Sequence, residues 1–246
     1  MEIGAQLYTV REFMKNTDAL AETLKKVADI GYRLVQVSGA CAYEPAWMKE
    51  QLEKNGLRCV LTHTACDRLL SDPAGVAAEH EVYGCDHIGI GYYNIAQEGM
   101  DAFAEKFIPV GETLRRCGKQ LMYHNHDMEF AKLGDTIILQ QLIERFTPEQ
   151  MGITMDTFWV QAGGGDPIDW LYRLEGRTPC IHLKDMGYGR KMMAVGEGNM
   201  NFEGILKAAE DTGVKYALVE QDDCNGEDPF ACLARSYAYL TAHGLR

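Results

Sequence analysis

Short apolar runs alternate with amphipathic helical patterns along the whole chain. Eight of the runs are rich in Val, Ile and Leu, which is typical of strands buried on both faces of a sheet. The predicted strands are residues 3–8, 34–39, 58–63, 87–92, 120–125, 152–159, 180–185 and 217–222.

Helical patterns with recognisable ends lie between these runs. Residues 18–30 place Leu20, Leu24 and Val27 on one face, with Thr17 as the expected N-cap and Gly31 just beyond the end. Other helices are expected over 45–55, 100–117 and 136–146, from Asn201 to a stop at Gly213, and after Asp-Pro pairs at 72–73, 166–167 and 228–229.

Eight strands, each followed by a helix at a spacing of roughly 30 residues, predict an α/β protein with a single (β/α)8 TIM barrel. We expect residues 1–246 to form this one domain. An open doubly wound sheet is the alternative, but the first strand ends in "QLYTVRE" and lacks the glycine-rich phosphate turn of that fold.

The composition, 46% hydrophobic and 24% charged, suits a globular chain with a large core. The net charge of −12 disfavours nucleic acid and anionic membranes as partners. No apolar run approaches the roughly 20 residues of a membrane span. The eight cysteines are scattered singly, which favours a reduced, cytoplasmic setting. The first residues already have the pattern of a strand, so we expect no targeting segment.

Titratable side chains gather at the ends of the predicted strands, where TIM barrels carry their active sites. They are His63 on the third strand; His124, Asn125 and His126 on the fifth, with Glu129 beyond; Asp156 on the sixth; His182, Lys184 and Asp185 on the seventh; and Glu220, Gln221 and Asp222 on the eighth.

Because side chains alternate between the two faces of a strand, each of three pairs shares one face of its strand. The pairs are His124 with His126, His182 with Lys184, and Glu220 with Asp222. If these faces point inward, imidazoles and carboxylates from four strands converge, and a divalent metal would compensate their charge. Taken singly, each residue has a simpler interpretation. A histidine could be a hydrogen-bonded core residue, Asp156 could cap the following turn, and Lys184 and Asp185 could form a surface ion pair. Their joint occurrence favours the metal site.

Two loops have weaker signals. The segment "GGGD" at 163–166 could hold an anion at a helix N-terminus, although a flexible turn is the simpler interpretation. The long segment 187–199, which contains Arg190 and Lys191, fits either a lid or a mobile surface loop.

The motifs "YHNHDMEF", "MDTFWV", "HLKD", "VGEG" and "VEQD" occur in this order, and with them the chain resembles the xylose isomerase-like superfamily of barrels, in particular its sugar phosphate isomerase/epimerase group. The resemblance implies one divalent ion held by Glu, Asp, His and Glu from strands 5 to 8. Asp156, His182 and Glu220 match the last three ligands, and His124 stands where the glutamate usually is. This donor set favours Mn, Co, Fe, Ni or Zn over Mg, and it leaves open a weakly held metal or help from Glu129.

The resemblance also implies an isomerase or epimerase of a small ketose or keto-glycoside, which abstracts a proton next to a metal-polarised carbonyl through an enediolate. Glu220 is the expected base, with Glu129 or His126 as its partner. The residues expected to bind or enclose the sugar are Lys184, His63, Gln6, Tyr8 and Trp159.

Two alternatives remain open. One is a dehydratase or lyase acting on a keto-inositol or 3-keto-glycoside, because the strand-5 histidines resemble the keto-inositol dehydratase branch. The other is a sugar-binding barrel without catalysis, which the missing glutamate permits. An endonuclease is disfavoured by the net charge and the single apparent metal set. The absence of a strong phosphate motif favours unphosphorylated sugars, and the sequence leaves a homo-oligomer open.

Overall fold

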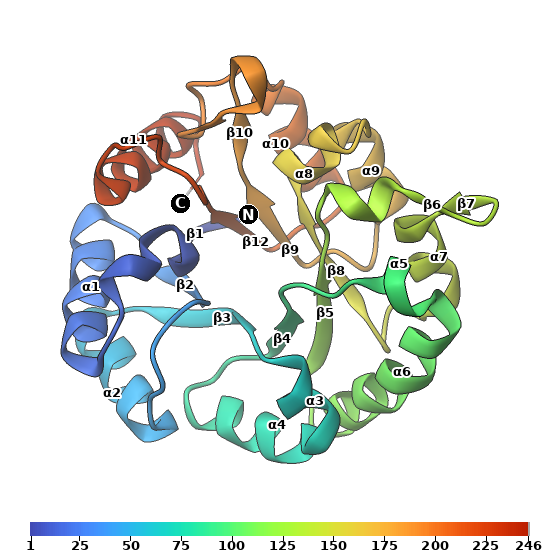
Figure 1. Ribbon diagram of the computed structural model, residues 1–246. Coiled ribbons are helices and arrows are strands. Elements are labelled where there is room, and N and C mark those ends of the chain that lie inside the picture. Colours follow the sequence, from blue (N-terminus) through green and yellow to red (C-terminus); the bar gives the residue numbers. More distant parts are fainter. Residues whose placement is uncertain (246) are drawn as a thin grey trace.

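Eight parallel strands close into a barrel in the computed structural model, which describes residues 1–245 (Figure 1). β1 pairs with both β2 and β12, which closes the ring. This confirms the predicted (β/α)8 barrel. The barrel strands are β1 (Glu2–Gln6), β2 (Leu34–Val37), β3 (Arg58–His63), β4 (His87–Ile90), β5 (Gln120–His124), β8 (Gly152–Asp156), β9 (Cys180–Leu183) and β12 (Tyr216–Val219).

Helices surround the barrel on all sides (Figure 1). They are α1 (Thr17–Ile30), α2 (Pro45–Asn55), α3 (Cys66–Ser71), α4 (Pro73–Val82), α5 (Ile95–Glu98), α6 (Met100–Arg116), α7 (Ile138–Arg145), α8 (Thr157–Ala162), α9 (Pro167–Arg173), α10 (Phe202–Asp211) and α11 (Pro229–Ala242). The loops add the 3-10 helices η1 (Leu7–Phe13), η2 (Asp127–Phe130) and η3 (Tyr188–Arg190), and the hairpins β6 (Lys132–Leu133) with β7 (Thr136–Ile137) and β10 (Asp185–Met186) with β11 (Met192–Met193).

Helix starts follow the side chains that cap them. The three Asp-Pro starts are confirmed, since Asp72, Asp166 and Asp228 each accept a hydrogen bond from a backbone N–H of the first turn. The predicted cap of α1 was wrong by one residue. Asn16 accepts from the N–H of Ala19, so it is the cap.

Several predicted elements began or ended elsewhere, and for two of them the structure shows the cause. The run 152–159 is a strand only to Asp156, because the Asp156 carboxylate accepts from the N–H of Trp159 and starts α8. The helix expected over 136–146 begins at Ile138, because Thr136 and Ile137 pair with β6.

The interior of the barrel changes from apolar to polar along its axis. Leu218 on β12 and Cys180 on β9 belong to an apolar cluster of the barrel interior that is separate from the larger core beneath the helices. Two residues further along the same strands lie Glu220 and His182, which are also buried. Because side chains two apart share a face, the same inward rows that fill the lower barrel carry the polar site at the C-terminal ends of the strands.

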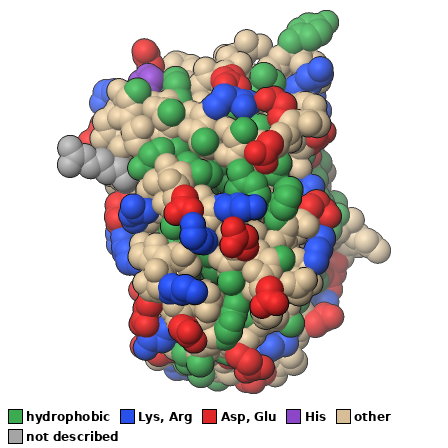
Figure 2. All heavy atoms as spheres, turned by 90° about the vertical axis from the view of Figure 1, so that its left-hand side faces the viewer, with side chains coloured by type: hydrophobic (Ala, Val, Ile, Leu, Met, Phe, Trp, Pro, Cys, Tyr) green, Lys and Arg blue, Asp and Glu red, His purple; other side chains and the backbone are tan. Residues whose placement is uncertain are grey.

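Within residues 1–245, no helix combines the length and apolar character needed to cross a bilayer. In Figure 2, which shows the side of the molecule at the left of Figure 1, basic and acidic side chains are interspersed. This face therefore lacks the broad basic patch typical of nucleic-acid binding.

Candidate metal centre

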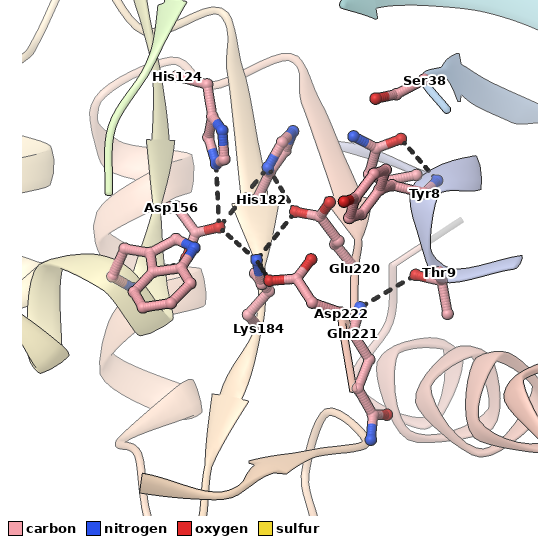
Figure 3. A network of polar contacts seen from close by, with 12 residues as sticks. Tyr8, Thr9, Ser38, His124, Asp156, His182, Lys184, Glu220, Gln221 and Asp222 are labelled. Atoms are coloured by element: carbon pink, nitrogen blue, oxygen red, sulfur yellow. Dashed lines mark hydrogen bonds and ion pairs between the residues drawn. The ribbon is translucent and has the colours of Figure 1, made fainter. Parts of the chain in front are cut away.

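Four ligand-type side chains meet at the C-terminal end of the barrel (Figure 3). They come from β5, β8, β9 and β12, which are consecutive strands of the ring. His124 and Asp156 end their strands, His182 is the next-to-last residue of β9, and Glu220 directly follows β12. One ligand atom of each lies within 4.8 Å of all the others, and all four residues are buried. This group could hold a metal ion, as the sequence predicted.

The distances fit a cation between the four side chains. The Oδ2 atom of Asp156 lies 3.2 Å from His124 Nε2 and 3.6 Å from His182 Nδ1. His182 Nδ1 lies 2.9 Å from Glu220 Oε2, yet neither atom is aligned for a hydrogen bond. Two nitrogen and two carboxylate donors suit Mn, Fe, Co, Ni or Zn.

Lys184 closes the carboxylate side of this group. Its Nζ lies 3.2 Å from Asp156 Oδ2, 3.1 Å from Glu220 Oε2 and 2.7 Å from Asp222 Oδ2. The interpretation as a surface pair with Asp185 is wrong, because Lys184 is only 1% exposed and contacts other carboxylates. Burial opposes the charge on Lys184, but the three carboxylates outweigh burial and raise the pKa of the lysine. Burial also opposes the charges of Asp156 and Glu220, but the lysine outweighs it and keeps the pKa of both carboxyl groups low.

Asp156 is a helix cap and also belongs to the candidate metal group. Its Oδ1 caps α8 through Trp159 N at 2.9 Å, while its Oδ2 faces the histidines and Lys184. Its backbone N–H donates to Asn125 Oδ1 at 3.0 Å, which holds the carboxylate in place. The helix cap and the candidate ligand are therefore the same side chain.

The pKa values of His124, His126 and His182 differ. Burial would lower the pKa of His182, but Glu220 and Asp156 raise it to about 9. Burial and the neighbouring His182 lower the pKa of His124, and burial with His124 lowers that of His126 to about 3. His124 is therefore neutral near pH 7, which is the form that binds metals.

A cavity of about 550 Å³ lies beside this group. The predicted site residues in its lining are Tyr8, His63, His124, His126, Lys184 and Glu220. The rest of the lining is Arg11, Ser38, Thr64, Ala65, Cys66, Gly91, Tyr92 and Asp222. A somewhat larger cavity of about 630 Å³ near Ile3 at the opposite end of the barrel contains none of the four ligands. Chemistry, rather than size, identifies the first cavity as the candidate site.

Five predicted residues are outside the lining of this cavity: Asp156 and His182 of the candidate metal group, and Gln6, Trp159 and Glu129. Gln6 is fully buried and accepts from Tyr8 N at 3.1 Å. Trp159 packs against His126, with ring centroids 5.5 Å apart. Glu129 accepts from the Tyr123 hydroxyl at 2.7 Å and from His126 N at 2.6 Å, and burial raises its pKa to about 7. In this arrangement these side chains support the groups that line the cavity.

His63 is held in a narrow slot. Its Nδ1 lies 3.2 Å from Ser38 Oγ, and its ring stacks on His124 at 5.2 Å. Gly91 makes the slot wide enough, because a Cβ there would lie 2.7 Å from His63 Nδ1. The Nε2 atom is buried and has no hydrogen-bond partner among the described residues.

The structure adds residues that sequence reasoning missed. Arg11 joins the η1 turn to the end of β12 by donating to Tyr8 O at 2.9 Å and to Asp222 O at 3.0 Å. Gln36 contacts His182 from across the barrel at 2.7 Å. The available signal for Gln36 was an amide within the apolar run "LVQV".

The loop motifs are explained by packing. Asp185 Oδ2 accepts from the N–H groups of Gly196 and Gly198, each at 2.9 Å, so "HLKD" and "VGEG" form one unit. This unit anchors the second half of the 187–199 segment. In "GGGD", a Cβ at Gly163 or Gly165 would lie within 2.6 Å of the Phe130 ring, so these glycines allow close packing in the turn before α9.

The comparisons with known proteins agree with this geometry. A model of the xylose isomerase-like TIM barrel family matches residues 24–236, which confirms the resemblance that the motifs predicted. An inosose dehydratase of Lacticaseibacillus casei is 25% identical over 154 residues, which cover 54% of this chain and 51% of that protein. The chain spans about half or less of the length of the curated relatives it matches.

Solved structures share the whole fold. A sugar phosphate isomerase/epimerase from Parabacteroides distasonis superposes with a TM-score of 0.82 at 21% identity, covering 98% of this chain and 93% of that one. An L-ribulose 3-epimerase gives a TM-score of 0.78 at 15% identity, with coverage of 98% and 94%. At these identities the likeness establishes the barrel fold.

Proposed function

The chain belongs to the xylose isomerase-like TIM barrel family, and from this premise we propose that it is a divalent-metal-dependent isomerase or epimerase of a small ketose or keto-glycoside. The observation that carries the proposal is the convergence of four ligand-type side chains within 4.8 Å of one another, beside a cavity of about 550 Å³ that His124 and Glu220 line. The four are His124, Asp156, His182 and Glu220. A cavity of this size suits a small ligand.

In this proposal the four converging side chains hold the metal, which as a Lewis acid would polarise the carbonyl and adjacent hydroxyl of a keto sugar. Glu220 lines the cavity and takes the proton from the carbon next to the carbonyl, which gives an enediolate. His126, whose low pKa leaves its imidazole neutral near pH 7, lines the same cavity and is the partner of Glu220 in this proton transfer. Lys184 and His63, which also line the cavity, hold substrate hydroxyls.

A dehydratase or lyase acting on a keto-inositol or 3-keto-glycoside is the second candidate. The match to an inosose dehydratase supports it, as do His124 at the end of β5 and His126 two residues beyond it. The first step is shared, because loss of a β-hydroxyl also follows removal of a proton next to the carbonyl. The two candidates differ in what leaves the intermediate.

Elemental analysis of the purified protein tests the metal mechanism. We expect near-stoichiometric Mn, Co, Fe, Ni or Zn in the wild type and its loss in His124→Ala and Asp156→Ala, because each variant removes a donor from the group. His243→Ala, at an exposed histidine, is the matched control and should retain the metal. A wild type that stays metal-free after reconstitution would overturn the mechanism.

Mass spectrometry of products then separates the reactions. Incubation of the metal-loaded protein with keto sugars and keto-inositols should give a product of unchanged mass for an isomerase or epimerase. A product lighter by one water would instead support the dehydratase, and a released aglycone the lyase. Binding of these compounds without any turnover would favour a non-catalytic sugar-binding barrel.

A further inference from the structure

Gln36 is a polar residue in the middle of a buried barrel strand. It is 0% exposed and lies in β2 between Val35 and Val37, which are also buried. A buried amide is costly unless its polar atoms are hydrogen bonded, and Val or Leu would fill this position without that cost. The amide therefore calls for a specific partner.

That partner is His182. The Oε1 atom of Gln36 lies 2.7 Å from His182 Nε2, and both side chains are fully buried. β2 and β9 are not neighbours, because β1 and β12 stand between them in the ring. The contact thus crosses the interior of the barrel and joins residues 146 positions apart in the sequence.

The backbone of β2 is adjusted at this point. Val35 lies opposite Cys59 on β3, whereas Gln36 lies opposite Leu61, so β3 contains one extra residue. This β-bulge keeps Gln36 level with Leu61, whose side chain belongs to the apolar cluster of the barrel interior. Bulges beside active sites commonly direct a side chain in this way.

The hydrogen bond determines which nitrogen of His182 faces the candidate metal. An amide oxygen only accepts, so Nε2 must carry the proton that it donates to Gln36. Nδ1 is the nitrogen that faces the carboxylates, 2.9 Å from Glu220 Oε2 and 3.6 Å from Asp156 Oδ2 (Figure 3). Histidine ligands of metals characteristically donate their other N–H to such a partner.

We infer that Gln36 is a positioning residue for the metal centre: its amide oxygen fixes the Nε2–H form and the ring orientation of His182, so that Nδ1 is presented as the ligand. The inference rests on the proposed metal site and deepens it. It explains why an amide occupies a position where the barrel otherwise favours an apolar side chain.

Zinc affinity, measured by competition with a chromophoric chelator, tests this role in the full-length protein. Gln36→Leu removes the acceptor at similar volume and should weaken zinc binding by about 10- to 100-fold. Gln36→Glu keeps an acceptor and should retain affinity near that of the wild type. Thr154→Val is the matched control, because Thr154 is a buried barrel residue whose hydroxyl has no partner. Thermal unfolding of the zinc-free proteins identifies any variant that fails to fold.

A second readout reports on the histidine itself. In the zinc-loaded wild type labelled with ¹⁵N-histidine, long-range ¹H–¹⁵N spectra should show a protonated Nε2 and a zinc-bound Nδ1 for His182. Unchanged zinc affinity in Gln36→Leu, an equal loss in Thr154→Val, or zinc on Nε2 would each overturn the positioning role while leaving the proposed function intact. Absence of zinc binding by the wild type would instead overturn the proposed metal mechanism and this role together.

Discussion

Lys184 and a bound metal would depend on the same carboxylate oxygens. Its Nζ lies within 3.2 Å of Asp156 Oδ2 and within 3.1 Å of Glu220 Oε2, and both oxygens belong to the candidate ligand set. In the metal-free protein this ammonium is the cation that compensates the buried carboxylates. Removing one partner of a buried ionic group leaves the others uncompensated.

Lys184→Met should therefore destabilise the metal-free protein by about 3–5 kcal/mol. Added Mn²⁺ or Zn²⁺ should restore more stability to this variant than it adds to the wild type, because the metal replaces the missing charge. Urea unfolding with and without metal measures both effects. Lys207→Met, at an exposed lysine paired with Asp211, is the control, and equal metal-free stability of Lys184→Met and the control would contradict the argument.

Single residues also show where sequence reasoning succeeds. His124, Asp156, His182 and Glu220 were predictable because each ends a recognisable strand, and parallel strands end at the same face. Gln36 was not, because its partner is 146 positions away and the contact exists only once the barrel closes. The supporting position of Glu129 was equally hidden, since it depends on how the turn after β5 folds.

At the scale of elements, the Asp185 side chain organises the loop after β9. Its carboxylate accepts from the backbone N–H groups of Met186, Gly196, Gly198 and Met200. A Cβ at Gly198 would lie 2.3 Å from Asp185 Oδ1, so only glycine lets the loop approach this closely. These bonds hold the loop next to the end of the strand that carries His182 and Lys184.

Asp185→Asn should release this loop, because an amide offers one acceptor oxygen instead of two, and its N–H₂ group repels backbone donors. Arg190 and Lys191 lie in the loop and are exposed trypsin sites. We expect trypsin to cleave there at least several-fold faster than in the wild type. Electrophoresis measures the rate of cleavage, and mass spectrometry identifies the cleaved bond. Asp169→Asn, at an exposed aspartate of α9, should not accelerate it, and equal rates in all three proteins would exclude the anchoring role.

Elements differed in how well the sequence predicted them. All eight barrel strands were found because buried parallel strands form short, dense apolar runs. The ends of the strands were harder to predict. In the sequence, Phe158 and Trp159 continue the apolar run, whereas in the structure β8 ends at Asp156, which caps α8. The two hairpins were missed, because strands of two residues leave no periodic signal.

At the scale of the whole molecule, regular spacing of strands and helices was sufficient to predict the barrel, because closure follows from eight repeated units. The chemistry of the interior was harder to predict, because it depends on which polar groups find partners after closure. His80 is an example, because in the sequence it is indistinguishable from an ordinary polar residue on the surface of a helix. In the structure it is 5% exposed and joins α4 to β3, with Nε2 at 2.8 Å from Thr62 Oγ1 and Nδ1 at 2.7 Å from Val76 O.

This buried histidine predicts a loss of stability in acid. Burial lowers the pKa of His80 to about 4, against 6.5 for an ordinary histidine. Between these values the unfolded chain binds a proton that the folded protein does not, so the free energy of unfolding decreases as the pH falls through this window. From about pH 7.5 to about pH 5 the wild type should lose about 2 kcal/mol more than His80→Gln, whose side chain does not titrate.

Urea unfolding of both proteins at the two pH values, with a chelator present, measures this difference. Other titrating groups contribute to both proteins and cancel in the comparison. His243→Gln, at an exposed histidine, should keep the pH dependence of the wild type. If His80→Gln kept it as well, the proton affinity of His80 would be the same in the folded and unfolded chain. The acid sensitivity of the barrel would then come from other buried groups with lowered pKa values, such as His87 and His63.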